Sequence, residues 1–237
     1  MAELFGTLSH IADMKIHHKD PFTLKDLLDG EKLYSLVTGF VLLGFSFVTY
    51  HFANAYAVLY LARSTTTFVG DIFLDNIPVI DLNFIIIEFA LITSAIFAVY
   101  LLFFKPSYAL FSLKALAVFN ITRALFISLT HMGDYPGHLV PGPGLIDGIF
   151  SYFDFQTGFF FSAHTGLPFL FALIFWKEPV LRYLFLSLSF VFGIAVLLGH
   201  VHYSIDVFAA PFMAYGVFRI VKYFFPHDYK LIEPPHV

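Results

Sequence analysis

The sequence contains no cysteine and few charged residues. The absence of cysteine from all 237 residues excludes disulfide bonds, catalytic thiolates and cysteine-based metal sites. Charged residues make up only 13% of the chain, hydrophobic residues make up 59%, and the mean hydropathy is +0.80. A chain of this composition cannot hide its apolar surface in one soluble core, so we expect an integral membrane protein. Its 33 phenylalanines and 13 tyrosines suit lipid-facing helices and interfacial aromatic belts.

Residues 1–32 also lack the pattern of a cleaved signal peptide. Asp, Lys and His are scattered through this stretch, with no short apolar region that ends in a small-residue cleavage site. Apolar side chains recur in it at helical spacing, at Leu4, Phe5, Leu8 and Ile11. The pattern predicts either an amphipathic cytoplasmic segment on the membrane surface or a small polar cap.

Apolar runs of roughly 20 residues, the length that crosses a bilayer, occur six times. They cover residues 33–56, 83–104, 107–130, 159–176, 180–200 and 203–223. The first run stays apolar to Leu61, which predicts either one long helix or a helix followed by an interfacial piece. We therefore expect an all-α fold with an N-terminal segment (1–32), a six-helix membrane domain (33–223) and a cytoplasmic tail (224–237).

The basic residues indicate how these helices cross the membrane. With a cytoplasmic N-terminus, ten of the thirteen fall on the inner side, and only Arg63 falls outside. Lys114 and Arg123 lie within the third span. The positive-inside rule thus places both ends of the chain in the cytoplasm.

Five ionisable side chains from four spans then share the outer leaflet. They are Glu88, Arg123, His164, His202 and Asp206. Such groups are costly in lipid without partners, so their common depth indicates a polar cavity that opens on the non-cytoplasmic side. Glu88 has a simpler explanation, a structural ion pair with Arg123.

The spacing of His202 and Asp206 indicates nucleophilic catalysis. At i and i+4 they share a helix face, where the carboxylate can orient the imidazole and raise the basicity of its other nitrogen. Such an imidazole can attack phosphorus and form a phosphohistidine. Phosphoryl transfer also needs a proton for the leaving oxygen and donors around the phosphate oxygens. His164 can supply the proton, and the phosphate-binding candidates are Arg123, Ser162 and Thr165.

A metal site is not expected. His200 and His202 are at i and i+2, on different helix faces, and no HxxxH or HxxHH run could complete a histidine-rich site. We expect no metal, no cofactor and no nucleic-acid partner.

Two motifs and the arginine stretch resemble the type 2 phosphatidic acid phosphatase superfamily. The motifs are "FSAHTGLP" (161–168) and "HVHYSIDV" (200–207), and "ITRALFISLT" (121–130) resembles the third-span arginine motif. Most similar is the sphingomyelin synthase branch, with SGHT followed by HYTIDV. The resemblance covers about residues 115–215. It implies six spans, cytoplasmic ends, an outward-facing site, His202 as nucleophile, Asp206 as its orienting group and His164 as the acid and base.

The chain also departs from these patterns. The Lys-x6-Arg-Pro motif of the phosphatases is absent, and Val196 replaces their arginine, as in the synthases. Ala163 replaces the motif glycine, and Gly158 stands where the synthases have aspartate. The leading hypothesis is a lipid phosphotransferase that moves a phospho-headgroup from a phospholipid donor to a lipid alcohol such as ceramide or diacylglycerol. The alternatives are a lipid phosphatase or phosphodiesterase that uses water, and a non-catalytic transporter or scaffold.

The segment from 131 to 158 is rich in glycine and proline and contains three aspartates. In the predicted orientation it lies on the active side of the membrane. It is long enough to form either a lid over the site or a plain connector.

Overall fold

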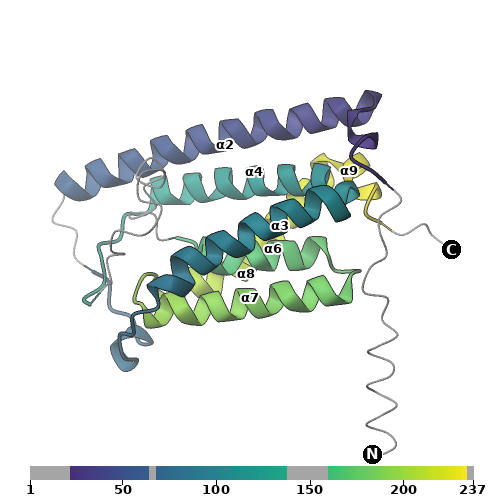
Figure 1. Cartoon of the computed structure of the whole chain (residues 1–237). Coiled ribbons are helices and arrows are strands. Elements are labelled where there is room, and N and C mark those ends of the chain that lie inside the picture. The colour runs from purple at the N-terminus through teal and green to yellow at the C-terminus, as the bar shows by residue number, and fades with distance from the viewer. Residues whose placement is uncertain (1–21, 64–67, 138–159, 234–237) are drawn as a thin grey trace, which may run out of the picture.

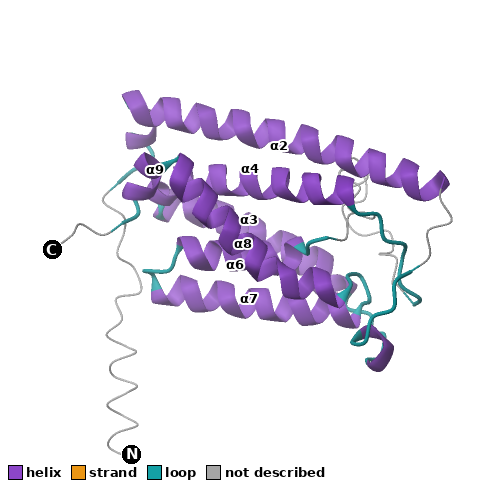
Figure 2. Cartoon of the chain, turned by 180° about the vertical axis from the view of Figure 1, so that it is seen from behind, coloured by secondary structure: helices purple, strands orange, loops and turns teal. Residues whose placement is uncertain are grey.

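The computed structural model describes residues 22–63, 68–137 and 160–233, and these ranges contain helices and loops but no strand (Figures 1 and 2). The helices are α2 (Gly30–Arg63), α3 (Ala90–Phe104), α4 (Pro106–Leu129), α6 (Ala163–Ile174), α7 (Pro179–Leu198), α8 (Ser204–Phe224) and α9 (Pro226–Lys230). A π-helical turn, η3 (Ile85–Phe89), leads directly into α3. Two short 3₁₀ turns, η1 (Asp26–Leu28) and η2 (Leu74–Asn76), complete the set.

Within the described residues, five helices are long and apolar enough to cross a membrane, so the chain is a polytopic helical membrane protein. They are α2, η3 with α3, α4, α7 and α8. Pro106 and Pro179 each occupy the first turn of a helix. A backbone N–H at this position would have no intrahelical acceptor, so proline costs the helix no hydrogen bond there.

The predicted span 159–176 differs from the structure. Helix α6 has only 12 residues and therefore extends over about 18 Å, less than a hydrocarbon core. It starts late because Ser162 is extended and caps it, with the Thr165 N–H donating to Ser162 Oγ at 3.4 Å. The Ser162 N–H donates to the Asp206 carbonyl at 3.1 Å, so residues before the helix are held by α8.

Helix α2 resolves the ambiguity of the first span. It is one continuous helix of 34 residues that passes Tyr56 and Leu61, so of the two alternatives left open by the sequence the single long helix is the one observed. At 1.5 Å per residue it is about 51 Å long, well beyond a bilayer core of about 30 Å.

The helices form a bundle in which α3 crosses one face (Figure 1) and α8 crosses the opposite face (Figure 2), with α6 between them. Helix α2 packs along α4, while α6 contacts both α7 and α8, and α8 contacts α4. Helix α3 crosses the face of the bundle, and α7 lies on the side opposite α2 (Figure 1). The largest buried cluster joins α4, α6 and α8 around Phe111, Phe119, Phe161 and Phe175.

The predicted tail packs back onto the bundle over its described part. Helix α9 brings Asp228 against Lys114 of α4, and the two side chains form a buried ion pair. Ser35 of α2 donates to the second Asp228 oxygen at 2.6 Å and accepts from Lys114 Nζ. This network explains the lysine within a membrane-spanning helix, since its charge is paired rather than exposed to lipid.

Removing only one partner of the Lys114–Asp228 pair is expected to destabilise the fold. Lys114→Met leaves a buried carboxylate without its cation, which costs about 3–5 kcal/mol, whereas Lys114→Met with Asp228→Leu is expected to restore most of the loss. The control is Lys222→Met at the half-exposed Lys222–Glu233 pair (3.3 Å), which is worth less than about 1 kcal/mol. Thermal unfolding in detergent measures all three, and equal losses from the buried and exposed lysines would contradict the assignment.

Residues 1–21, 64–67, 138–159 and 234–237 lie outside the described residues. The amphipathic N-terminal prediction, most of the 131–158 segment and Gly158 therefore fall there. Within residues 22–32 the described elements are η1 and the first turn of α2.

Candidate active site

The turn between α7 and α8 contains His200 and His202. His200 follows the helix in the left-handed conformation (φ 51°), and its N–H donates to the Leu197 carbonyl at 3.0 Å. The next N–H, that of Val201, reaches back to Val196 at 2.9 Å. These two bonds form a Schellman motif, which ends α7 sharply. A non-glycine residue in this conformation costs about 1 kcal/mol or more, which is the strain expected at a functional turn.

His202, two residues before α8 begins, and Asp206, in the first turn of α8, form a buried pair, so the side chains meet although the prediction that both lie on one helix face is wrong. The His202 side chain lies 3.4 Å from Asp206 through Nδ1 and Oδ2, and Asp206 is fully buried. The same carboxylate oxygen accepts the Tyr203 N–H at 3.1 Å, which fixes the carboxylate at the first turn. A carboxylate can only accept, so it favours the tautomer with the proton on Nδ1 and the lone pair on Nε2.

His164, in the first turn of α6, lies beside this pair. The rings of His164 and His202 are 6.1 Å apart between centroids and are inclined by 65°. His164 Nε2 lies 3.0 Å from the backbone oxygen of Ile86 in the π-helical turn. Two histidines separated by 38 positions in the sequence therefore converge, as a shared site requires.

Ser162 and Thr165 are both buried at the start of α6. Ser162 caps the helix, and Thr165 packs against α7, where a Cβ on Gly193 would lie 3.3 Å from Thr165 Oγ1. Thr165 Oγ1 has no hydrogen-bond partner among the described residues. Both residues thus lie next to His164, and contact of either hydroxyl with phosphate stays a prediction.

Arg123 is buried on α4 and is bound to the same segment. Its Nε donates to the Phe161 carbonyl at 2.8 Å, and a terminal nitrogen donates to the Tyr50 hydroxyl at 3.2 Å. The guanidinium carbon also lies 5.4 Å from the centre of the Tyr50 ring, a cation–π arrangement. No ion pair joins Glu88 to Arg123 within the described ranges, so the predicted structural pair is wrong.

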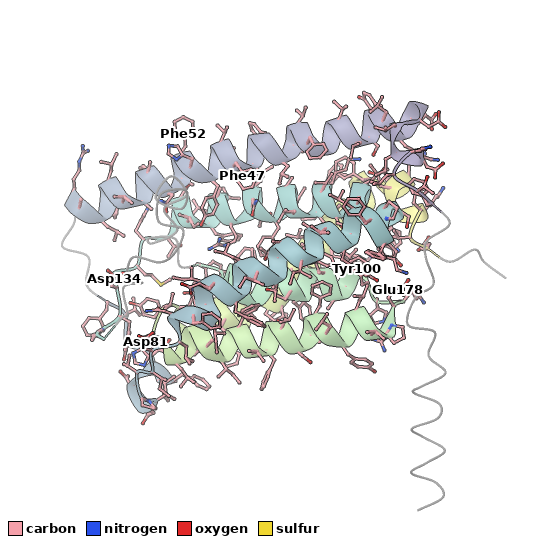
Figure 3. The ribbon with its side chains drawn as sticks, in the orientation of Figure 1. Phe47, Phe52, Asp81, Tyr100, Asp134 and Glu178 are labelled. Carbon is pink, nitrogen blue, oxygen red and sulfur yellow. The ribbon has the colours of Figure 1, made fainter. Side chains whose placement is uncertain are left out.

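The loop that precedes η3 and the loop that follows α4 cover the start of α8. Asp71 Oδ2 accepts the Ser204 N–H at 2.6 Å, and Asp71 Oδ1 accepts from Phe73 and Leu74. Tyr135 donates to Asp75, which raises the pKa of Tyr135 to about 12. Figure 3 shows Asp81 and Asp134 at this end of the bundle, opposite Glu178. Loop 68–84 therefore supplies an acceptor for the Ser204 N–H, in addition to Asp206, which accepts the Tyr203 N–H from within α8.

Asp71 makes the stability of the site pH-dependent. Burial alone would raise the pKa of Asp71, but its hydrogen bonds from Ser204, Leu74 and Phe73 outweigh this and hold the pKa below the ordinary value. The stabilisation is therefore fully present above the unfolded-state pKa of about 3.9 and is lost as the pH falls through the lower folded-state pKa.

We expect Asp71→Asn to lower the free energy of unfolding by about 1 kcal/mol at pH 7. The amide has only one oxygen acceptor, so its NH₂ group would face the Ser204 N–H and could not accept from it. The difference from wild type should shrink below about pH 4. Asp81→Asn is the control, since exposed Asp81 accepts only the Asn83 N–H among the described residues and an amide oxygen can accept it equally well. Thermal unfolding across pH measures both, and a difference that stays constant with pH would contradict this role.

Two surface concavities lie away from the histidines. One, of about 420 Å³, lies between α2 and α4 and includes Phe52 and Leu125. The other, of about 350 Å³, includes Trp176 and Tyr229. His164 and His202 line neither.

No protein-family model matches this chain, and no curated protein matches it. The site is therefore interpreted from its own geometry. No cluster of three or more possible metal-ligating His, Cys, Asp or Glu side chains occurs in the described part of the chain.

Three contributors to the site were not predicted from the sequence. They are the backbone oxygen of Ile86, the cap from Asp71 and the hydroxyl of Tyr50. Tyr50 and Asp71 belong to no motif in the sequence, and every residue has a backbone carbonyl. The sequence therefore carries no signal that marks these three groups as part of the site.

Proposed function

We propose that the protein is a membrane lipid phosphotransferase that moves a phospho-headgroup from a glycerophospholipid to a lipid alcohol. The observation that carries the proposal is the convergence of His202, oriented by buried Asp206, with His164 at a ring separation of 6.1 Å. A nucleophile, its orienting group and a second proton-carrying group are the parts that covalent phosphoryl transfer requires. Their position in a polytopic membrane protein favours a lipid substrate.

The first half of the reaction forms a covalent intermediate. The lone pair of His202 Nε2 attacks phosphorus, and the bond between phosphorus and the diacylglycerol oxygen breaks. The leaving oxygen keeps the electron pair and takes a proton from the His164 imidazolium. Asp206 stabilises the positive charge that forms on the phosphorylated ring.

The second half reverses these roles. His164, now neutral, takes the proton of the acceptor hydroxyl, whose oxygen attacks phosphorus. The bond between phosphorus and Nε2 breaks, and the electron pair returns to His202. The headgroup phosphate has then moved to the acceptor, and both histidines are back in their starting states.

The surrounding groups suit a phosphate. Arg123 and the first turn of α6, with Ser162 and Thr165, provide one buried cation and a set of donors beside His164. We propose that a bound substrate draws Arg123 from the Phe161 carbonyl toward the phosphate oxygens. The positive end of the α6 dipole favours the same charge.

The proposed architecture is a six-helix bundle like that of the type 2 phosphatidic acid phosphatases. Helix α6 is the short member of this bundle and is buried among the five longer helices. The distribution of lysine and arginine supports cytoplasmic termini and a site that faces the non-cytoplasmic side. The motifs "SAHT" and "HYSIDV" support the sphingomyelin synthase-like branch.

Reconstitution with headgroup-labelled lipids tests the proposal. Purified protein is incubated with labelled phosphatidylcholine or phosphatidylethanolamine, with and without ceramide or diacylglycerol. A new headgroup-bearing lipid that depends on the added acceptor is the expected result. Free phosphocholine or phosphoethanolamine without any transfer would show a hydrolase, and no turnover of either donor by folded protein would favour a non-catalytic role.

A further inference from the structure

The π-helical turn η3 faces His164. In η3, backbone bonds run to the fifth residue, a geometry that is rare and is often found at functional sites. The oxygen of Ile86, the second residue of this turn, lies 3.0 Å from His164 Nε2. The contact joins residues 78 positions apart, so it is made by the tertiary fold and not by local sequence.

The Ile86 oxygen is held firmly in place. The Ile86 side chain is 3% exposed and belongs to a cluster with Ala195, Val196 and Val207 of α7 and α8. A Cβ on Gly199 would lie 3.1 Å from Ile86 Cδ1, so the end of α7 fits closely around this side chain. The elements that fix Ile86 are therefore the ones that position His202 and Asp206.

A carbonyl oxygen can only accept a hydrogen bond, so His164 Nε2 must carry the proton in this contact. In the neutral ring the lone pair is then on Nδ1. His164 Nδ1 is buried and makes no hydrogen bond to any described residue. The atom that is left to exchange protons with a substrate is thus defined by the contact at the other nitrogen.

We infer that the Ile86 carbonyl is a positioning group that holds His164 as the Nε2–H tautomer, and that protons move to and from substrate through Nδ1. The proton role rests on the proposed function. In the first half-reaction the Nδ1–H proton passes to the leaving oxygen, and its bonding electrons stay on Nδ1. In the second half-reaction the acceptor hydroxyl returns a proton to Nδ1, while Nε2–H stays bound to Ile86.

Nitrogen NMR of wild-type protein labelled with ¹⁵N-histidine tests the tautomer without any turnover. The His164 signals are assigned by their loss in His164→Gln. At a pH where His164 is neutral, we expect a protonated Nε2 and an unprotonated Nδ1. The Nδ1–H tautomer would overturn the inference, even if the enzyme transfers headgroups. The expected tautomer in a protein that turns over no lipid would instead overturn the proposed function and the proton role with it.

A backbone change tests the carbonyl itself. Replacing Ile87 by its α-hydroxy acid turns the Ile86 carbonyl into an ester, which is a weaker acceptor. We expect a mixed His164 tautomer and a fall in kcat of about 10–100-fold, by analogy with the loss of partners that orient metal-bound histidines. The matched control is the same replacement at Ile92, which is half exposed on α3. An Ile87 ester with an unchanged tautomer and wild-type kcat would overturn the inference.

Discussion

Replacement of His202 by alanine is expected to lower the proposed headgroup transfer by about 10⁴-fold or more, because the proposed reaction loses the atom that bonds to phosphorus. The residual rate should be independent of Asp206, since the carboxylate then has no imidazole to orient. The measurement is initial transfer of labelled headgroup in proteoliposomes that contain equal amounts of folded protein.

His202 is only 6% exposed, so loss of activity must be separated from loss of fold. His202→Asn serves this purpose, because its side-chain NH₂ can replace Nδ1–H toward Asp206 but has no counterpart of Nε2. We expect it to be as inactive as His202→Ala and to keep the unfolding temperature close to that of wild type. His51→Ala, at an exposed position of α2, should transfer normally. A His202→Asn variant with near-wild-type rate would show that the nucleophile is elsewhere.

The second large effect is expected from His164→Ala, and it should depend on the leaving group. With a phospholipid donor the leaving diacylglycerol oxygen is strongly basic and needs a proton, so we expect a loss of about 10²–10⁴-fold. With 4-nitrophenyl phosphocholine the leaving nitrophenolate is weakly basic and needs none. Its release by His164→Ala should therefore approach the wild-type rate in the first turnover.

The same variant should stall after that first turnover. Without His164 no group deprotonates the acceptor alcohol, so a burst of nitrophenol followed by slow turnover is expected. His202→Ala should show no burst with this donor. Equal losses for His164→Ala on phospholipid and nitrophenyl donors would indicate a structural role for His164 and would contradict proton transfer.

The sequence predicted much of the helical organisation. Long apolar runs identified the spans, and Pro106 and Pro179 marked two helix starts, because both signals are local. The end of α2 was ambiguous because the run stays apolar to Leu61, longer than a bilayer core requires, and the excess could form either more of the same helix or an interfacial piece. Helix α6 was predicted too long because its apolar composition gives no sign that Ser162 is extended and bonded to Asp206.

The candidate site was predicted only in part. The His202 and Asp206 side chains do meet, but His202 lies two residues before α8 begins, so the turn that leads into the helix brings them together and not a shared helix face. The contact of Arg123 with the Phe161 carbonyl was not foreseen, because a buried arginine in a membrane is satisfied by any nearby oxygen, including backbone. The Ile86 carbonyl was also not predictable, since its role comes from a π-helical turn and from packing against α7 and α8.

The most direct test of the account is to trap the bond between His202 and phosphorus. His164→Ala is mixed with 4-nitrophenyl phosphocholine, quenched during the burst under alkaline conditions and digested for mass spectrometry. The account predicts a phosphocholine adduct on the peptide that contains His202, and none when His202→Asn is added to the variant. An adduct on another residue, or nitrophenol release at the full rate without any adduct, would contradict it.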